Sequence, residues 1–522
     1  MDKNSPGDSD GSSSRGPLAW VATAAAGIVL LSFLVKTLLG RKRLPGPLFT
    51  VPIFGDSIEL LTSDPARLLF NRFKRYGKVF RMHLLGCEAV VVADPEALRP
   101  ILGNDGALFE IPVQSFKWLM GSYYVQNRKE IHTPWRKLFL NLLTGGGLKE
   151  MLPRVRKIME EHVQQWERDG RVEIFEEARL MGLDLAIFAI TGVNLEGLVD
   201  LDWFKEQMEL FLGGLWGLPV ALPGGKLSKG LAAKERLLEA LMPLLKDRHE
   251  AFCAEFEAAG RDATQMVNRL LESKEPVTVQ KAQMVGFHSM GCDSLRDTAQ
   301  SVLHSVMAAA DTTRFSLFNC WALLAQLPRV QDKIFEEQKK VVAEYGPEVS
   351  FSALSNMPYL EATFKEALRL FPSTAGGFRK LTRDKKVGDL TLPAGTTVWV
   401  HALMLQMVDP VLWDGDTSVD LPAHMDWRNN LEAAFRPERW LGDEKQRPRN
   451  FYVFGNGAHQ CAGMQLVILE VKLLLALVLR KYRLLPETPD MLRRCEVFPF
   501  VVPARGTDGM LLVPREEPLP WH

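Results

Sequence analysis

Cysteine is scarce in this chain, with six residues among 522 and no two of them spaced as Cys-x-x-Cys. So few cysteines exclude a disulfide-scaffold protein, and their spacing excludes zinc ribbons and thioredoxin-like redox motifs. This usage is typical of a reducing compartment, so a cysteine with a chemical role must act alone. The candidates are Cys87, Cys253, Cys292, Cys320, Cys461 and Cys495.

An excess of charge of either sign is also absent. Lysine and arginine together number 63, as do aspartate and glutamate, so the formal net charge is zero. We therefore expect no nucleic-acid partner bound through a basic excess. With 47% hydrophobic and 24% charged residues, the composition is that of a folded protein and not of a disordered one.

The only run long and apolar enough to span a membrane lies near the N-terminus. Residues 18–39 carry one charge, Lys36, near their C-terminal end. A helix of this length spans roughly 33 Å, enough for a bilayer core, although a buried core helix is the alternative. Arg41, Lys42 and Arg43 follow, and the positive-inside rule then places the rest of the chain in the cytosol. We expect a disordered tail over 1–17, a transmembrane anchor helix over 18–39, a basic, proline-containing hinge over 40–47 and one large domain over 48–522.

The remaining sequence predicts a mostly α fold with small β-sheets. No second linker and no repeat interrupts it, which favours one domain. Short strands are expected at 79–82, 89–92, 387–401 and 496–514. Helical periodicity covers 134–144, 150–167, 177–191, 203–213, 231–256, 296–327, 331–344, 359–370 and 463–482. Two polar, turn-rich stretches, 286–296 and 414–431, are interpreted as insertions.

One cysteine lies in a loop suited to a thiolate ligand. The segment 454–463 is FGNGAHQCAG, in which glycines precede Cys461 and an apolar helix follows it. Glycines let backbone N–H groups point at the sulfur, and a helix N-terminus favours negative charge. Phe454 supplies an apolar cover. A buried, inert cysteine is the alternative, and the spacing of four fixed positions, F-x-x-G-x-x-x-C-x-G, argues against it.

Two further segments place charged residues in apolar helices. The first, 306–313, is VMAAADTT, with Asp311 and Thr312 after three alanines. Its plainer interpretation is a threonine bonded to the carbonyl of Ala308, with an aspartate facing solvent. The second places Glu366 and Arg369 one helical turn apart, where an exposed ion pair is the usual outcome.

The decapeptide around Cys461 resembles the haem-binding loop of the cytochrome P-450 superfamily of haem-thiolate monooxygenases. The resemblance implies the triangular, mostly helical P-450 prism, with haem b held in a loop containing Phe454 and Gly457. It implies that Cys461 is the metal ligand on the proximal side of the iron. A thiolate ligand donates electron density that favours O–O cleavage.

Other motifs follow in the family's order. The segment 306–313 is similar to the oxygen-activating helix, which implies a hydrogen-bonding role for Thr312, a proton relay through Asp311 and a local kink in the helix. The segment 435–440, FRPERW, resembles the family's PERF segment with Trp440 in the phenylalanine position. This implies a buried structural triad of Glu366, Arg369 and Arg439.

The resemblance also implies which residues bind the haem and the substrate. The expected cationic partners of the haem propionates are His132, Arg136, Arg379 and His459. The expected apolar pocket next to the iron contains Ala308, Ala309, Thr374 and Ala375. The segments 357–379 and 213–225 are similar to the branch with retinoic-acid hydroxylases, plant steroid hydroxylases and a cyanobacterial retinoid hydroxylase.

The expected activity is therefore insertion of one oxygen atom from O2 into a small apolar substrate, such as a sterol, retinoid or other isoprenoid. No flavin or nicotinamide motif is present, so electrons from NADPH must arrive through a flavoprotein reductase. A basic docking face for it is expected at Arg136, Lys137, Lys445, Arg447 and Arg449, with an ordinary solvated charge run as the alternative.

Alternatives remain at this stage. A haem-thiolate isomerase or dehydratase acting on a peroxide needs no reductase, and a membrane-anchored helical binding protein needs no haem. The lipid bilayer is an expected partner, and the endoplasmic reticulum membrane is the expected location, with the domain in the cytosol. A plastid envelope is the second location considered.

Overall fold

The computed structural model describes residues 44–47, 55–84, 87–103, 106–121, 127–192, 199–215, 217, 219–273, 275–496 and 500–521. The expected tail at 1–17 and anchor at 18–39 lie outside these residues. Of the helices in the described ranges, none is both long and apolar enough to cross a membrane. The chain divides into two compact units, Met1–Pro45 and Gly46–His522, and every element below belongs to the second.

Helices make up most of the described chain. The first half contains α2 (Ser57–Thr62), α3 (Pro65–Tyr76), α4 (Pro95–Leu102), α5 (Gln114–Met120), α6 (Lys129–Leu143), α7 (Gly145–Asp169), α8 (Ile174–Asp184), the π-helix η2 (Leu185–Ile190), α9 (Leu201–Leu215) and α10 (Lys226–Ala258). The second half contains α11 (Ala263–Glu272), α12 (Val279–Ser289), α13 (Leu295–Ala325), α14 (Pro328–Tyr345), α15 (Phe351–Ser355), α16 (Pro358–Leu370), α17 (Ala402–Met407), α18 (Leu431–Ala434) and α19 (Met464–Leu479). Short 3-10 turns occur at η3 (Pro437–Trp440), η4 (Glu444–Gln446), η5 (Gly457–His459) and η6 (Met491–Arg494).

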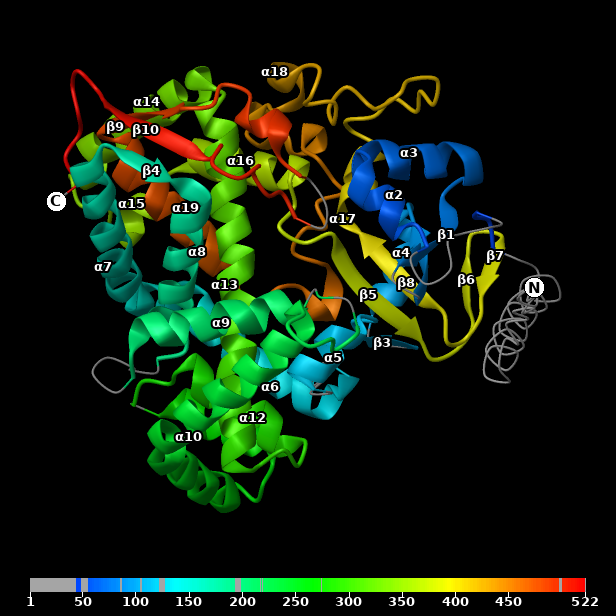
Figure 1. The fold of residues 1–522 in the computed structure, drawn as a ribbon, viewed down its shortest axis with the longest axis vertical. Coiled ribbons are helices and arrows are strands. Elements are labelled where there is room, and N and C mark those ends of the chain that lie inside the picture. The colour runs from blue at the N-terminus through cyan, green and yellow to red at the C-terminus, as the bar shows by residue number, and fades with distance from the viewer. Residues whose placement is uncertain are drawn as a thin grey trace, which may run out of the picture. The chain divides into compact units, whose positions relative to one another are not determined.

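The strands form three small sheets. They are β1 (Val79–Leu84), β2 (Cys87–Val92), β3 (Ala107–Phe109), β4 (Arg171–Glu173), β5 (Gly376–Leu381), β6 (Lys385–Val387), β7 (Leu390–Leu392), β8 (Thr397–His401), β9 (Tyr482–Pro486) and β10 (Gly509–Pro514). The largest sheet has the order β1-β2-β8-β5-β3, and only its β2–β8 pair is parallel. The others are β4-β10-β9 and the hairpin β6-β7. Figure 1 shows the five-stranded sheet to one side of the helices, with α3 beside it. The mostly helical fold with small sheets is thus confirmed.

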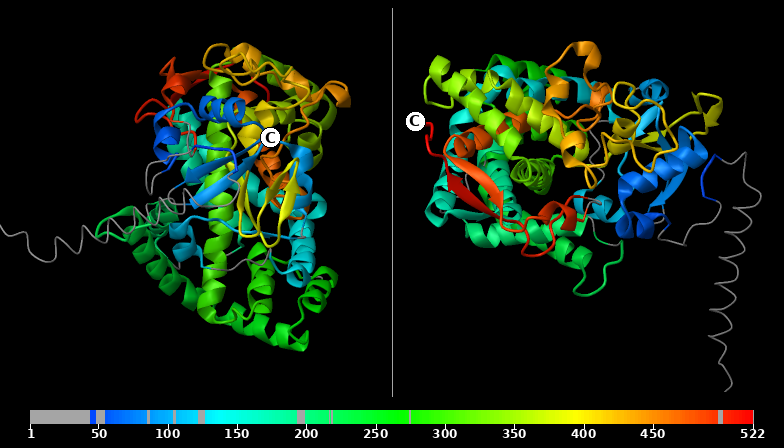
Figure 2. Two further views of the ribbon diagram at one scale, coloured as in Figure 1. Left: turned by 90° about the vertical axis from the view of Figure 1, so that its right-hand side faces the viewer. Right: turned by 90° about the horizontal axis from the view of Figure 1, so that it is seen from above.

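Helix α13 runs through the middle of the helical part. Figure 1 shows it nearly upright, and the view from above in Figure 2 looks down its axis with other helices around it. Its start is fixed by a capping box, in which Ser294 accepts from the N–H of Asp297 and the Asp297 carboxylate accepts in return. Two separate apolar cores pack against it, and Ala309 touches both. A side chain at this level of α13 therefore lies at the centre of the protein.

The helix boundaries differ from the sequence expectation in several places. The helices expected to start at 134, 150 and 231 each begin five residues earlier, as α6, α7 and α10. The helix expected at 463–482 ends at Leu479, because Tyr482 already pairs in β9. The helix expected at 177–191 changes to π geometry at Leu185. The stretch 286–296, interpreted as an insertion, is the end of α12, a short turn and the start of α13.

Candidate active site around Cys461

The loop before α19 is shaped by glycines. Gly455 and Gly457 have φ of +70° and +74°, in the left-handed region that side chains disfavour. A Cβ on Gly457 would lie 2.8 Å from the carbonyl oxygen of Leu102, so the loop can approach α4 only with glycine there. The N–H of Cys461 donates to the carbonyl of Phe454 at 2.7 Å, which closes the loop. The predicted residues Phe454, Gly457 and Cys461 are thereby brought together.

The sulfur of Cys461 lies at the N-terminal end of α19. Backbone N–H groups of Gly463 and Met464 point toward it, and the Arg136 guanidinium is near. Burial raises the pKa of the thiol, whereas these three groups lower it without reversing the shift. Cys461 nevertheless has an exposed surface, so it is closely surrounded and still accessible. A thiol in this setting becomes a thiolate when a metal ion coordinates it.

Two arginines and two histidines, Arg136, Arg379, His132 and His459, gather beside this loop. The rings of His132 and His459 are 4.8 Å apart between centroids, and Arg136 donates to the carbonyl of Gln460 at 2.6 Å. Burial, then the charges of Arg379, His132 and Arg136, lower the pKa of His459 to about 4. Burial and Arg136 lower the pKa of His132 to about 4 as well.

The fourth member, Arg379, is the least satisfied. Burial lowers its pKa to about 10, and its Nε has no hydrogen-bond partner in the described part of the protein. The Nδ1 atom of His459 is likewise without a partner there. Buried donors without acceptors and a cluster without a neutralising anion both favour a bound carboxylate or phosphate. The four predicted propionate partners therefore lie together, and their chemistry fits an anionic cofactor edge.

Asp311 and Thr312 lie midway along α13, at the centre of the fold. The hydroxyl of Thr312 donates to the carbonyl of Ala308 at 2.8 Å, as the plainer interpretation of the sequence foresaw. Asp311 is half-buried and 4.0 Å from Arg314. Burial raises its pKa to about 6, with Arg314 opposing the shift and Glu209 adding to it. The local kink expected here is absent, because α13 is continuous α-helix from Leu295 to Ala325.

The predicted structural triad is present as a set of contacts. The buried carboxylate of Glu366 accepts two hydrogen bonds from Arg369, at 2.8 and 2.9 Å, and a third from Arg439. Sequence reasoning missed two further donors, the N–H of Arg436 at 2.9 Å and the indole of Trp440 at 3.0 Å. Both donors lie in the segment 435–440, and the indole of Trp440 is a donor that a phenylalanine at this position would lack.

The predicted substrate-pocket residues are only partly brought together. Ala308 is exposed although it lies midway along α13, so the helix has an open surface at that level. Ala375 lines a cavity of about 50 Å³ with residues of α16, β8 and the segment around Trp427. Ala308, Ala309 and Thr374 do not line this cavity.

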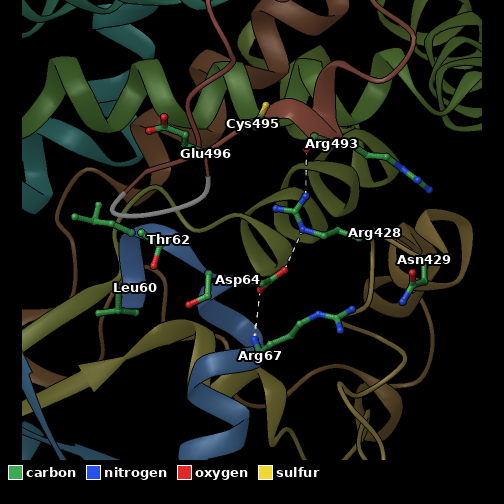
Figure 3. Close-up of a pocket in the computed structure, with 11 residues that line it drawn as sticks. Leu60, Thr62, Asp64, Arg67, Arg428, Asn429, Arg493, Cys495 and Glu496 are labelled. Carbon is green, nitrogen blue, oxygen red and sulfur yellow. Dashed lines mark hydrogen bonds and ion pairs between the residues drawn. The ribbon is translucent and has the colours of Figure 1, made fainter. Parts of the chain in front are cut away.

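A larger cavity, of about 540 Å³, lies elsewhere and contains none of the predicted site residues. Figure 3 shows it between the first turn of α3, the segment at Arg428 and the segment at Arg493. Within it, Arg428 forms an ion pair with Asp64 at 3.0 Å and donates to the backbone carbonyl of Arg493 at 3.3 Å, so these lining groups already have partners. We therefore assign the site to Cys461 and not to the larger cavity.

The family model "Cytochrome P450" matches residues 44–415 and 433–507. The unmatched gap, 416–432, nearly coincides with the insertion expected at 414–431, whereas 286–296 lies within the matched range.

Abscisic acid 8'-hydroxylase 1 of Arabidopsis thaliana is 24% identical over 88% of this chain and 91% of its own length. Cytochrome P450 85A of Phaseolus vulgaris is 26% identical over 89% of this chain and 91% of its own length. The solved structure titled retinoic acid bound cyanobacterial CYP120A1 has a TM-score of 0.70 and 22% identity, covering 90% of this chain and 99% of that one.

Proposed function

We propose, from the premise that this chain belongs to the cytochrome P450 family, that it inserts one oxygen atom from O2 into an apolar isoprenoid. The family implies an enzyme of the monooxygenase class with a haem-thiolate cofactor. When bound, haem b supplies the redox centre at which O2 is reduced and the substrate is oxidised. The proposal concerns what the residues of this chain do around it.

The observation that carries the proposal is the pairing of Cys461 with the cluster of two arginines and two histidines. Cys461 presents an accessible sulfur where two backbone N–H groups converge. Beside it, Arg136 and Arg379 provide positive charge, and the neutral rings of His132 and His459 provide N–H donors, without a neutralising carboxylate among their described contacts. A flat metal complex with two carboxylates matches both halves of this arrangement.

Asp311 is suited to moving a proton during oxygen reduction. A carboxyl group with a pKa near 6 gives up and regains a proton close to neutral pH, which an exposed aspartate does not do readily. Thr312 lies next to it and holds its hydroxyl proton toward the carbonyl of Ala308. We infer that this hydroxyl turns from the backbone to donate toward the reacting oxygen, while Asp311 resupplies the proton.

An isoprenoid substrate is supported by the relatives. As their names state, one hydroxylates abscisic acid and another binds retinoic acid, and both of these molecules are isoprenoid acids. The open surface at Ala308 is apolar, so it suits a hydrocarbon portion of such a molecule. An anchor at 18–39 would bring the enzyme to the membrane in which these lipids dissolve, and we place it in the endoplasmic reticulum with its catalytic domain in the cytosol.

Electrons are expected from an NADPH-dependent flavoprotein reductase. Lys137, Lys445, Arg447 and Arg449 are exposed, which suits a docking face for an acidic partner. Arg136 is half-buried and bonded to Gln460, so we assign it to the cofactor and not to this face.

The test is turnover by the purified, haem-loaded protein with a reductase, NADPH and a panel of retinoids, sterols and triterpenes. We expect one panel member to shift the haem absorption on binding and to gain one oxygen atom from labelled O2. Product without NADPH from a lipid hydroperoxide would instead establish the isomerase or dehydratase alternative. Failure of every isoprenoid, with oxidation of another lipid class, would overturn the substrate assignment alone.

A further inference from the structure

A second cluster of metal-ligating side chains lies on α10 and α12. His249 and Cys253 are one helical turn apart on α10, and His288 is at the end of α12. The ligand atoms of the three residues all lie within 4.8 Å of one another. Figure 1 shows α10 and α12 at one end of the helical part, on elements other than those that hold Cys461. Nothing in the proposed oxygenase chemistry uses these residues.

The spacing within the cluster suits a tetrahedral ion. The Nε2 atom of His249 is 3.6 Å from the sulfur of Cys253. A zinc ion with bonds of ~2.0–2.1 Å to nitrogen and ~2.3 Å to sulfur sets these two atoms about 3.5 Å apart. Residues at i and i+4 share one face of a helix, so this pair is in place without any change in α10.

The surroundings hold the histidine rings in place. The Nδ1 atom of His249 lies 2.9 Å from the hydroxyl of Thr298, so Nε2 is the nitrogen left to bind an ion. His288 is buried, with the rings of Phe252 and Phe256 edge-on to it. Ring fixation by a hydrogen bond on the far nitrogen is typical of histidines that ligate metals.

The shifted pKa of His288 favours this arrangement, whereas that of Cys253 opposes it until a cation binds. Burial and the neighbouring His249 lower the pKa of His288 to about 4, so its imidazole is neutral at physiological pH, as a ligand must be. Burial raises the pKa of the Cys253 thiol, which a bound cation would reverse. The nearby carboxylate of Asp293 pairs with Arg261, so it is not counted as a ligand. His249 and Cys253 are only half-buried, which leaves a path for an ion.

We propose that His249, Cys253 and His288 bind one Zn²⁺ ion, with water as the fourth ligand. One sulfur and two imidazole nitrogens are the donors that zinc accepts in tetrahedral sites, whereas magnesium and calcium prefer oxygen. The ion joins α10 to α12 and so stabilises this end of the helical part. The site is separate from the haem ligand and does not depend on the proposed function.

The test is zinc binding by the purified, haem-loaded protein, measured by titration with ZnCl2 against a competing chelator. We expect one zinc per haem iron, a zinc X-ray absorption edge fitted by one sulfur and two nitrogen ligands, and a melting temperature that rises with zinc. Cys253→Ser and His249→Gln should each abolish the stoichiometric zinc and the rise in melting temperature. Cys292→Ser, a half-buried cysteine outside the cluster, should leave both unchanged.

The haem absorption spectrum of each variant shows whether it is folded. The proposal would be overturned if the folded wild-type protein did not bind zinc at a ratio near one ion per protein. Zinc binding unchanged in both Cys253→Ser and His249→Gln would overturn it as well, because the ion would then lie elsewhere. Loss of zinc in the Cys292→Ser control would also contradict this ligand set.

Discussion

Arg369 donates two hydrogen bonds to the carboxylate of Glu366, at 2.8 and 2.9 Å, and neither side chain reaches solvent. Arg369 also donates to the carbonyl of Ala434, as does Arg439. The pair therefore connects α16 to the segment that precedes the Cys461 loop. Although burial opposes ionisation, Arg369 and Arg439 lower the pKa of the Glu366 carboxyl.

Arg369→Ala should leave the buried carboxylate of Glu366 without its main hydrogen-bond donor. Breaking a buried ion pair in this way costs about 3–5 kcal/mol of folding free energy, so we expect the variant to lose haem during purification. The measurement is haem per protein together with urea unfolding. Arg494→Ala, which removes an exposed ion pair with Asp490, is the control and should change stability by at most ~1 kcal/mol. Normal haem content in Arg369→Ala would contradict the account of this triad.

Thr312→Ala should lower the product formed per NADPH consumed. The substitution removes the hydroxyl, together with one methyl group, from the α13 surface beside Asp311. Without the hydroxyl, protons reach the reacting oxygen less selectively. Thr363→Ala is a matched control, because Thr363 also donates to the carbonyl four residues before it, at 2.8 Å. Equal coupling of NADPH to product in wild type and Thr312→Ala would exclude the proposed role.

Arg379→Ala should have opposite effects on the two forms of the protein. Without haem, Arg379 is a buried cation lacking a carboxylate partner among the described residues, so its removal should raise the melting temperature of the apoprotein. In the haem-loaded protein, the substitution removes a charged hydrogen bond from Arg379 to the cofactor, worth about 1.5–3 kcal/mol. Haem should therefore dissociate roughly tenfold to a hundredfold faster.

Lys380 is the more exposed neighbour of Arg379 on β5, so Lys380→Ala is the control. It should change neither the melting temperature of the apoprotein nor the rate of haem dissociation. Haem dissociation from Arg379→Ala at the wild-type rate would show that Arg379 does not bind the cofactor.

Glu470→Gln should stabilise the protein in a pH-dependent manner. Glu470 is buried on α19 and accepts a hydrogen bond from Thr313 at 3.3 Å, and burial raises its pKa to about 8. The folded state thus keeps a proton that the unfolded chain releases above its ordinary pKa of about 4.3, so stability falls as pH rises from about 4.5 to 8.

The Glu470→Gln variant does not lose stability in this way as pH rises, because glutamine does not titrate. Its melting temperature should equal that of wild type near pH 4.5 and exceed it increasingly up to pH 8. The exposed Glu432→Gln serves as the control. A difference from wild type that does not grow with pH would refute the assignment of a protonated Glu470.

Part of the fold was predictable because α13 and α16 are long, largely apolar runs without an internal proline or glycine. The helices expected at 296–327 and 359–370 correspond to α13 and α16 within two residues at each end. Short helices such as α4 were not foreseen, although Asp94 and Pro95 form an ordinary start signal there. A run this short offers too few turns for periodicity to show.

The candidate site was predictable where its residues are close together in the sequence, as in the loop at Cys461. Contacts that join distant segments carried no sequence signal. The hydrogen bond from Trp440 to Glu366 and the buried Glu470 depend on how α16, η3 and α19 pack, which spacing does not reveal. His249 and Cys253 have a recognisable i, i+4 spacing, but their third partner comes from another helix.

The central claim is that Cys461 is a working thiolate ligand. The most direct test is a carbon monoxide difference spectrum of the reduced, haem-loaded protein, recorded beside Cys461→Ser and a Cys87→Ser control. The account predicts a red-shifted Soret band in wild type and in Cys87→Ser, and its loss in Cys461→Ser. A band at the position of a histidine-ligated haem in wild type, or the same red-shifted band in Cys461→Ser, would contradict it.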